Sequence, residues 1–258
     1  PSGVGIGSPY ASANRPAGGG RARADSLHLD EDLVDRDGRR LQEPSERHVL
    51  ARAWDDAAMC AAEPANPWDE YADGWDDDHG ARAYASAAYG SLVDICGERG
   101  LSLTGATVCD FGCGTGLLTE RLAAVVRSID AVDTSAAMLA VLSAKIEMRG
   151  MTNVYPSMVP PASLATHDIV VCSSVLGFVD DYAATVHGLV RLLRPTGLFV
   201  QWDWERDEDA TEPHGLGRAE VNDALTGAGL DAVEVDTAFE VAVEGATMRP
   251  LLGVGQRP

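Results

Sequence analysis

The sequence predicts an α/β fold built on a mostly parallel sheet. From Gly105 onward, apolar runs of strand length alternate with amphipathic helical patterns, the order expected of crossover units in a parallel sheet. After the first apolar run, the stretch TVCDFGCGTGLLTERL places three glycines within five residues. With 258 residues and 45% hydrophobic content, the chain is long enough for one core and a small cap. We therefore expect a single core over residues 105–258.

Two segments precede this core. Residues 1–47 lack hydrophobic periodicity and are predicted to be a disordered tail. The first 24 residues contain three arginines and no acid, which leaves a transit peptide, a flexible tail and an expression artefact open. Residues 48–104 turn helical and are predicted to form a cap, in which apolar side chains recur at spacings of three and four at Tyr89, Leu92, Val93 and Cys96.

An aromatic and acidic segment lies inside the cap. In PWDEYADGWDDDHG, Trp68, Tyr71 and Trp75 keep spacings of three and four among six acidic residues. Aromatic side chains at this spacing fit packing against a helix and contact with a ligand equally well, so both interpretations remain open.

Hydrophobic periodicity and the positions of glycine and proline predict the elements of the core. In chain order we expect a strand over 106–111, a helix from about 116, a strand ending in IDAVD, a helix over SAAMLAVLSAKIEMRG stopped by Gly150, a short strand near 154, a strand over 168–174, a helix over DDYAATVHGLVRLLRP with Leu193 on its apolar stripe, a strand over GLFVQWDW, a short helix near Val221, and a strand over 233–243. The final MRPLLGVGQ should close the fold as an antiparallel hairpin at or near one sheet edge.

Charge and composition exclude several kinds of partner. Forty acidic against twenty basic residues give a net charge of -20, which repels nucleic acid and anionic lipid. No apolar run approaches the roughly twenty residues that span a bilayer. The five cysteines form no CxxC and no ligand pairs, so we expect reduced thiols and no metal. We predict a cytoplasmic protein, with organellar targeting by the tail as the alternative.

The glycine-rich bend predicts a nucleoside site. Glycines between a strand and a helix expose backbone N–H groups and let a ligand approach the main chain. The spacing is G-x-G-x-G, because Leu117 stands where the dinucleotide fingerprint needs its third glycine. Asp110 precedes the bend, and Asp133 ends the next strand, where a carboxylate can accept both hydroxyls of a ribose.

These residues resemble the class I S-adenosylmethionine-dependent methyltransferases. VCDFGCGTG matches the first motif of that family and IDAVDTSAAML the second, and HDIVVCSSVLGFVDD with LLRPTGLFVQWDW is similar to its fourth and fifth strands. WDEYADGWDDD is similar to a segment before the core of many small-molecule members. The resemblance covers about residues 66–258 and implies a Rossmann-like, seven-stranded sheet.

The resemblance also implies site residues and S-adenosyl-L-methionine as cofactor, with S-adenosyl-L-homocysteine as product. Asp110 would face the cofactor's amino group, directly or through water, and Asp133 would hold the ribose hydroxyls. The other implied contacts are Gly112, Cys113 and Gly114 at the methionine part, Ser173 at the methionine and substrate side, Thr134 beside Asp133, Trp75 over the sulfonium, and Tyr71 as a further cofactor contact. The acid that many relatives carry after the third strand is missing from YPSMVPPASL, which leaves the adenine to Met158 or Val159.

The cofactor carries an activated methyl group, so a general base is optional. If the acceptor must lose a proton, Asp203 in QWDWE is the best-placed carboxylate, with Trp202 and Trp204 able to wall a pocket. The competing interpretation of Asp203 is a solvated carboxylate at a strand end. His214, in the segment after the fifth strand, is the other candidate base, against an ordinary surface histidine.

The predicted function is methyl transfer to a small-molecule acceptor by in-line displacement. The acidic, aromatic cap favours a neutral or cationic acceptor. One alternative is a cofactor-binding or interaction module without turnover. The other is an NAD(P)-dependent oxidoreductase, against which Leu117 argues. The oligomeric state is left open.

Overall fold

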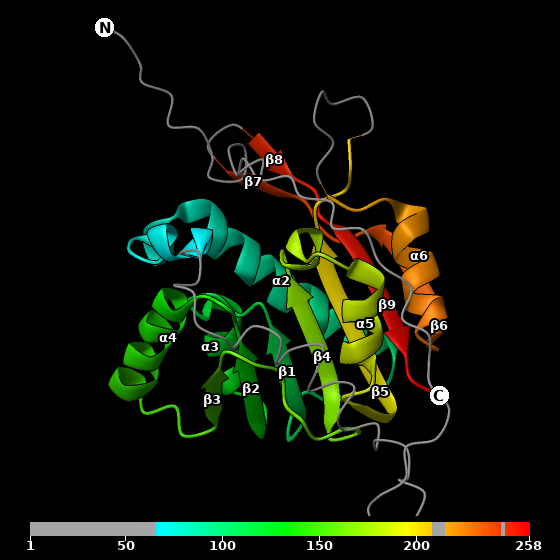
Figure 1. Cartoon of the computed structure of the whole chain (residues 1–258), viewed down its shortest axis with the longest axis horizontal. Coiled ribbons are helices and arrows are strands. Elements are labelled where there is room, and N and C mark those ends of the chain that lie inside the picture. Colours follow the sequence, from blue (N-terminus) through cyan, green and yellow to red (C-terminus); the bar gives the residue numbers. More distant parts are fainter. Residues whose placement is uncertain (1–65, 208–214, 244–245) are drawn as a thin grey trace, which may run out of the picture. The chain divides into compact units, whose positions relative to one another are not determined.

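The computed structural model describes residues 66–207, 215–243 and 246–258 (Figure 1). The predicted tail over residues 1–47, the part of the predicted cap before residue 66 and the candidate base His214 lie outside the described residues.

A seven-stranded sheet forms the centre of the fold, in the order β3-β2-β1-β4-β5-β9-β6. The first five of these strands are parallel, and β9 runs antiparallel to both β5 and β6. The bounds are β1 Thr107–Phe111, β2 Ser128–Val132, β3 Val154–Ser157, β4 His167–Ser173, β5 Leu193–Asp203, β6 Asp231–Thr237 and β9 Leu251–Gln256. The predicted mostly parallel, seven-stranded sheet with an antiparallel hairpin at one edge is confirmed.

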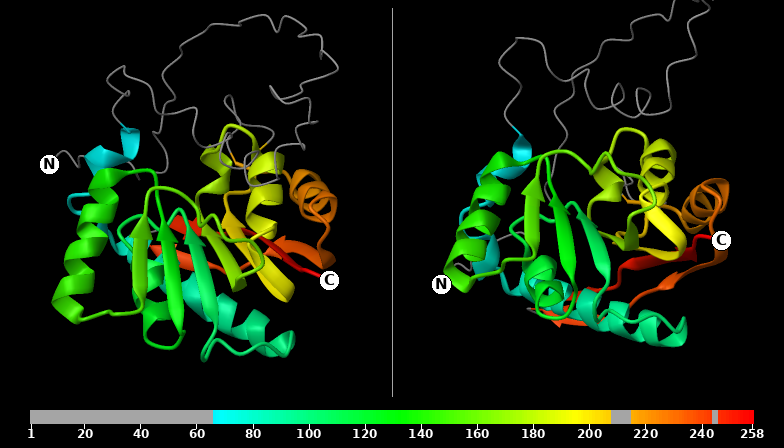
Figure 2. Two further views of the ribbon diagram at one scale, coloured as in Figure 1. Left: turned by 60° about the horizontal axis from the view of Figure 1, so that its bottom comes forward. Right: turned by 90° about the horizontal axis from the view of Figure 1, so that it is seen from below.

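Helices cover both faces of this sheet (Figure 2). One apolar cluster joins the sheet to α2 His79–Glu98, α3 Leu117–Ala123 and α4 Ala136–Arg149, and a second joins it to α5 Tyr182–Val190 and α6 Arg218–Gly227. Strands in the middle are buried on both sides, as Val108 and Cys109 on β1 show with 0% exposure each. The fold is therefore a three-layer arrangement with two cores.

Local signals explain where α4 begins and ends. The Ser135 hydroxyl accepts a hydrogen bond from the Met138 N–H at the first turn, and Gly150 ends the helix with φ 64°. Gly150 was the predicted stop, and it adopts the left-handed conformation that glycine supplies at low cost.

Three predicted elements differ from the structure. The helix predicted to run to Pro195 ends at Val190, and Leu193 begins β5, because a buried apolar stripe has the same composition in a helix and in a strand. The strand predicted over 233–243 is divided into β6 and β7 Val241–Val243. Val93 is 41% exposed, and the buried face of α2 runs through Ala88, Leu92 and Ile95 instead.

A small second sheet lies against α2. β7 pairs antiparallel with β8 Ala246–Met248, and β7 contacts α2. Nearby, the Tyr84 ring on α2 lies 5.6 Å from the Trp204 ring and 5.3 Å from the Phe239 ring. This aromatic packing attaches the end of β5 and the β6–β7 connection to the helix.

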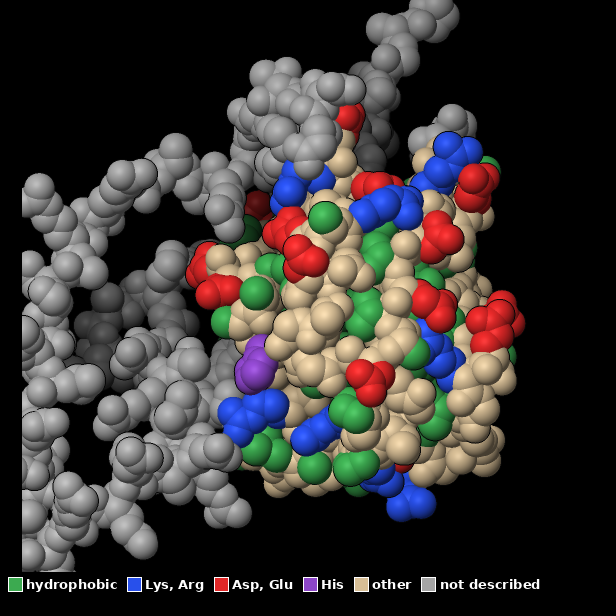
Figure 3. Space-filling model, turned by 90° about the vertical axis from the view of Figure 1, so that its right-hand side faces the viewer, with side chains coloured by type: hydrophobic (Ala, Val, Ile, Leu, Met, Phe, Trp, Pro, Cys, Tyr) green, Lys and Arg blue, Asp and Glu red, His purple; other side chains and the backbone are tan. Residues whose placement is uncertain are grey.

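Acidic and basic side chains are interspersed over the side of the molecule that Figure 3 shows. Around α6, Arg206 pairs with Glu220, and Arg218 pairs with Glu205. The negative charge of the chain is therefore not gathered into a single-sign patch around this helix. Within the described ranges, no helix combines the length and the apolar character needed to cross a membrane.

Candidate functional site

The glycine-rich bend lies at the carboxyl end of β1. Gly112, Gly114 and Gly116 all have positive φ angles, of 75°, 53° and 87°. The N–H groups of Gly112 and Cys113 donate to the Val132 carbonyl at 2.7 and 3.0 Å, which holds the bend against the end of β2. The bend therefore sits where open α/β sheets bind ligands, outside the carboxyl ends of the strands.

The three glycines serve different physical purposes. A Cβ atom on Gly112 would lie 2.4 Å from the Val175 side chain, and one on Gly116 would lie 2.4 Å from Leu142 Cδ1. A Cβ on Gly114 would meet no atom within 4 Å. Two glycines thus permit close packing of the protein on itself, whereas Gly114 leaves open space directly above the main chain.

Asp133 connects the two loops that follow β1 and β2. Its carboxylate accepts the Gly114 N–H at 2.8 Å through Oδ2 and the Ser135 N–H at 2.8 Å through Oδ1. Burial raises the pKa of the Asp133 carboxyl, and these two hydrogen bonds counteract the shift. A third backbone bond, from Thr134, also lowers the pKa, and since a carboxylate has about four acceptor positions, acceptor capacity remains for a ligand.

Asp110 is a buried acid with one unused oxygen. Its side chain is 1% exposed, and Oδ2 accepts a hydrogen bond from the Thr119 hydroxyl at 2.5 Å. Oδ1 has no hydrogen-bond partner in the described part of the chain. Burial raises the pKa of Asp110 to about 6, although the bond from Thr119 lowers it. An unpaired buried oxygen is costly, which favours a cationic or N–H partner supplied by a ligand.

Residues 66–78, called the strap from here on, cross this loop region. The strap consists of two short 3-10 helices, η2 Pro67–Tyr71 and η3 Trp75–Asp77, separated by Gly74 with φ 87°. Two of its side chains bond to the loop after β2: Asn66 donates to the Thr134 hydroxyl at 3.1 Å, and Asp69 accepts the Ser135 hydroxyl at 2.6 Å.

The strap also bonds to the glycine-rich bend. The Thr115 hydroxyl, in a residue that is 1% exposed, donates to Asp76 Oδ1 at 2.7 Å. Together with the two bonds to the loop after β2, this bond holds the strap to both loops that form the candidate cofactor site.

Trp68 is the centre of an aromatic cluster on the strap. Its ring centroid lies 5.9 Å from Tyr71, 6.3 Å from Trp75 and 5.1 Å from Phe178. Tyr71 and Trp75 were candidate site residues, but Trp68 and Phe178 were not. The spacing of the aromatic residues could have indicated Trp68, while no local signal pointed to Phe178, which lies 41% exposed after β4.

The end of β4 brings two serines to the site. Asp110 pairs with Val171, and Ser173 lies two residues further on the same face of the sheet. Ser174 has φ 54°, which is strained for a residue other than glycine, and its buried hydroxyl has no partner among the described residues. Sequence reasoning selected Ser173 and missed Ser174, because backbone strain leaves no trace in the residue type.

Met158 stands just beyond β3, beside the Asp133 loop. The Asp133 N–H donates to the Ser157 carbonyl at 3.1 Å, so the end of β3 is directly attached to this acid. Met158 is 52% and Val159 57% exposed. Both side chains present exposed apolar surface close to the Asp133 loop.

Asp203 is buried on the opposite face of the sheet. Trp202 pairs with Ser173, so the next residue faces away from Asp110. Asp203 is 0% exposed and accepts N–H bonds from Leu176 at 2.8 Å and Gly177 at 3.1 Å. Burial raises its pKa to about 6, against these hydrogen bonds.

The interpretation of Asp203 as a solvated carboxylate is therefore wrong. Its neighbours also differ from the expected pocket walls: Trp202 is 0% exposed and donates through Nε1 to the Ser91 hydroxyl at 3.1 Å. Trp204 packs against Tyr84, as described above. The Asp203 carboxylate thus holds the loop after β4 in place by accepting hydrogen bonds from the backbone N–H groups of that loop.

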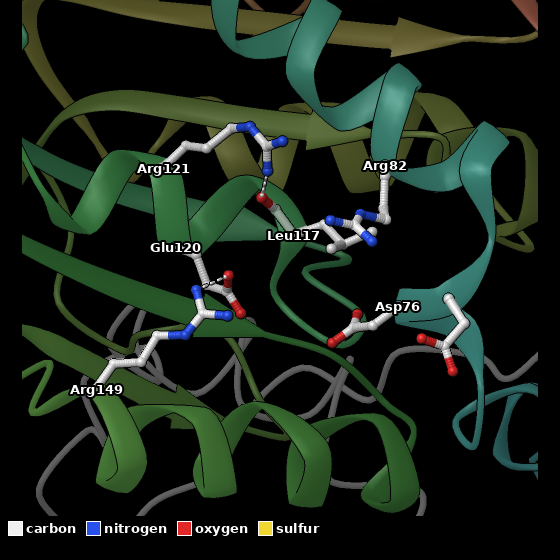
Figure 4. Close-up of a pocket in the computed structure, with 7 residues that line it drawn as sticks. Asp76, Arg82, Leu117, Glu120, Arg121 and Arg149 are labelled. Atoms are coloured by element: carbon white, nitrogen blue, oxygen red, sulfur yellow. Dashed lines mark hydrogen bonds and ion pairs between the residues drawn. The ribbon is translucent and has the colours of Figure 1, made fainter.

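A charged hollow lies between the strap and the helices α2, α3 and α4 (Figure 4). It is lined by Asp76, Asp77, Arg82, Leu117, Glu120, Arg121 and Arg149. Across residues 66–207, 215–243 and 246–258, no group of three or more His, Cys, Asp or Glu side chains is arranged to hold a metal ion.

Comparisons with known proteins identify methyltransferases as similar to this chain. Residues 109–201 match a family described as "Methyltransferase domain". A Ubiquinone biosynthesis O-methyltransferase of Xylella fastidiosa is 32% identical over 136 residues, which are 50% of this chain and 54% of that protein. The protein of the same name from Paraburkholderia xenovorans is 34% identical over 99 residues, 37% of this chain and 43% of that protein. The chain thus spans about half the length of the curated relatives it matches.

Solved structures share the fold at low sequence identity. A SAM-dependent methyltransferase from Aquifex aeolicus superposes with a TM-score of 0.54 at 19% identity, covering 73% of this chain and 97% of that one. A magnesium protoporphyrin IX methyltransferase from Synechocystis, solved with bound SAH, gives 0.55 at 18% identity, covering 70% and 88%. The predicted resemblance is confirmed for the fold, and the part of the chain that carries it contains the glycine-rich bend.

Proposed function

We propose that this chain, whose residues 109–201 match a methyltransferase domain, transfers a methyl group from S-adenosylmethionine to a small-molecule acceptor. The observation that carries the proposal is the combination at the carboxyl edge of β1 and β2. There, a Cβ on Gly114 would meet open space, Asp133 bridges the two loops, and the buried Asp110 has an oxygen without a hydrogen-bond partner among the described residues.

The residues present fit the proposed cofactor. Asp110 Oδ1 would accept the amino group of its methionine part, and the main chain of the bend at Gly112, Cys113 and Gly114 would border that part, with the open space at Gly114. Asp133, with Thr134 beside it, would hold the ribose hydroxyls through the acceptor positions not used by the loop.

The remaining contacts are proposed in the same way. Met158 offers exposed apolar surface for the adenine, with Val159 as the alternative. Ser173 would line the methionine and acceptor side, next to Ser174, whose hydroxyl has no partner among the residues that the structure describes. Tyr71 and Trp75 would lie over the sulfonium, whose positive charge an aromatic face can stabilise.

When bound, the cofactor supplies a methyl group already activated on a sulfonium. The chain's own contribution is alignment and exclusion of water. The strap supplies a cover, because it is bonded to both loops and packs Trp68 on Phe178 beyond β4. Residues 66–104 therefore serve as a cap on a catalytic core that begins near residue 105.

Because Asp203 is buried, we propose a different role for it from that of a general base. Its oxygens accept N–H bonds from Leu176, Gly177 and Trp204, so it fixes the backbone near the acceptor side and does not point into a pocket. We assign it as a positioning residue. His214 remains the candidate base for an acceptor that must lose a proton.

The acceptor class follows from charge and from the relatives. The strap carries six acidic side chains, which favours a neutral or cationic acceptor over an anionic one. Relatives that bear the name O-methyltransferase favour a hydroxyl as the methyl acceptor.

A ligand titration tests the cofactor. The thermal midpoint of the wild type should rise with S-adenosylmethionine and with S-adenosylhomocysteine and stay constant with NADPH. Asp133→Ala should lose the rise, whereas Asp130→Ala, which removes an acid on β2 that pairs with His167, should keep it. A rise with NADPH alone would favour the oxidoreductase alternative and contradict the proposal.

Turnover separates an enzyme from a binding module. A panel of small phenols, catechols and amines is incubated with S-adenosylmethionine, and formation of S-adenosylhomocysteine is followed. Product with any acceptor supports the enzyme. Cofactor binding with no product across the panel favours the module.

A further inference from the structure

Lys145 is the one lysine in the sequence, and it is buried. It lies on α4 with 8% of its side chain exposed. Its Nζ atom is 2.5 Å from Asp76 Oδ2 and 2.7 Å from Glu120 Oε1. A buried ammonium is costly unless it is paired, so both carboxylates are needed to hold it there.

The two carboxylates belong to different parts of the fold. Asp76 is on the strap, within η3, and Glu120 is on α3, which follows the glycine-rich bend. Figure 4 shows both carboxylates at the hollow between these elements. Lys145 therefore joins three segments, the strap, α3 and α4, through one positive charge.

Asp76 carries this connection to the bend itself. While Oδ2 pairs with Lys145, Oδ1 accepts the buried hydroxyl of Thr115, which lies between Gly114 and Gly116. The residue before Asp76 is Trp75, proposed above to lie over the sulfonium. A group that fixes Asp76 therefore fixes the strap relative to the open space above Gly114.

We propose that Lys145 is a positioning residue that fastens the strap over the cofactor loops through Asp76. It touches neither the cofactor nor the acceptor. Its part in cofactor retention rests on the proposed function, but its part in holding the strap does not.

Removing the ammonium should release the strap. Lys145→Met leaves Asp76 and Glu120 close together without a shared counter-charge, which strongly disfavours the closed arrangement. Arg149 cannot substitute, because it pairs with Glu120 alone and its side chain is 55% exposed. Arg149→Met is thus the matched control, since it removes a positive charge from the same cluster but none from the strap.

A double variant separates strap fastening from simple destabilisation. In Lys145→Met with Glu120→Gln, the negative charge of Glu120, which shares Lys145 with Asp76 in the wild type, is removed, so much of the thermal stability lost in Lys145→Met should return. The strap should remain loose, because Asp76 still has no ammonium partner. Lys145→Arg keeps a positive charge and should restore part of the fastening.

Two readouts are measured well below each variant's unfolding temperature. Chymotrypsin cleavage after Tyr71 and Trp75, followed by mass spectrometry, reports strap opening without any ligand. Stopped-flow fluorescence reports the dissociation rate of S-adenosylhomocysteine. We expect both rates to rise at least about tenfold in Lys145→Met and in the double variant, because removing one partner of a buried ion pair is strongly destabilising, and to stay at the wild-type value in Arg149→Met.

The outcomes are distinguishable. Wild-type cleavage and dissociation rates in a folded double variant would overturn the proposal. If the wild type binds no S-adenosylhomocysteine, the proposed function fails, and the cleavage rates alone decide whether Lys145 fastens the strap. Equal acceleration in Arg149→Met would show a general effect of charge and would also overturn it.

Discussion

Protonation of Asp110 is expected to weaken cofactor binding at low pH. Its carboxyl is buried and has a pKa of about 6, and its Oδ1 atom is free to accept an amino group. Only the ionised form attracts a cationic amine strongly. Affinity for S-adenosylhomocysteine should therefore fall as the pH drops below the pKa of Asp110.

The magnitude follows from the ionised fraction. With a pKa of about 6, the carboxylate is nearly all ionised at about pH 7.5 and about one-eleventh ionised at about pH 5. A binding-competent fraction of about one in ten raises the apparent dissociation constant about tenfold, or ~1.4 kcal/mol.

The stability of the unliganded protein should change in the opposite direction. Because burial raises the pKa of Asp110 from 3.8 to about 6, the folded state holds a proton that the unfolded state has released. The stabilisation is complete below about pH 4 and is lost as the pH rises through about 6, by about 3 kcal/mol. Burial also raises the pKa of Asp203 to about 6, so Asp203 lowers the free energy of unfolding over the same pH range. The contribution of Asp110 is therefore the difference in this pH dependence between the wild type and Asp110→Asn.

Titration calorimetry with S-adenosylhomocysteine at the two pH values measures the first effect, and urea unfolding measures the second. Compared with the wild type, Asp110→Asn should bind S-adenosylhomocysteine more weakly at about pH 7.5. At about pH 5 the dissociation constants of the two proteins should be similar. Asp223→Asn, at an exposed acid on α6, should behave as the wild type. A wild-type dissociation constant that is equal at both pH values would refute the assignment of Asp110. So would a variant Asp110→Asn in which the ratio of the dissociation constants at the two pH values is the same as in the wild type.

Three further results are expected. Gly116→Ala should lower the free energy of unfolding by about 3 kcal/mol in urea titrations, because its Cβ would lie 2.4 Å from Leu142 Cδ1. Gly114→Ala has no such clash and should cost only about 1 kcal/mol for its positive φ, yet weaken S-adenosylhomocysteine binding in the same calorimetric assay. Cys109 and Cys172, both 0% exposed with pKa values raised by burial, should escape iodoacetamide in the native protein and react after unfolding, as peptide mass spectrometry would show.

The sequence was most informative where a residue's position follows from topology. Asp110 and Asp133 were placed correctly at neighbouring strand ends, since parallel strands bring their carboxyl ends to one edge. It could not show that Asp133 bonds the Gly114 N–H, because that bond depends on the exact path of the bend. The helix predicted to include Leu193 was wrong because burial, not period, dominates that segment.

Contacts between distant segments were beyond sequence reasoning. The rings of Trp68 and Phe178 are in contact although more than a hundred residues separate them in the sequence. Neither their residue types nor their spacing predicts this contact. Asp203 was correctly placed at a strand end, but its burial depends on how the loop after β4 folds over it. The importance of Lys145 likewise emerges only when the strap, α3 and α4 are seen together.

The place of β9 in the sheet bears on how the protein is made. β6 is synthesised before β9, and in the main sheet it pairs with β9 alone. One edge of β5 also has β9 as its partner, so this edge stays unpaired until β9 has been synthesised. Until β9 emerges, a nascent chain therefore presents an open edge on β5 and leaves β6 without its partner in the main sheet, and both favour pairing with other chains. The growing chain should depend on chaperones most strongly after β6 has been synthesised and before β9 has.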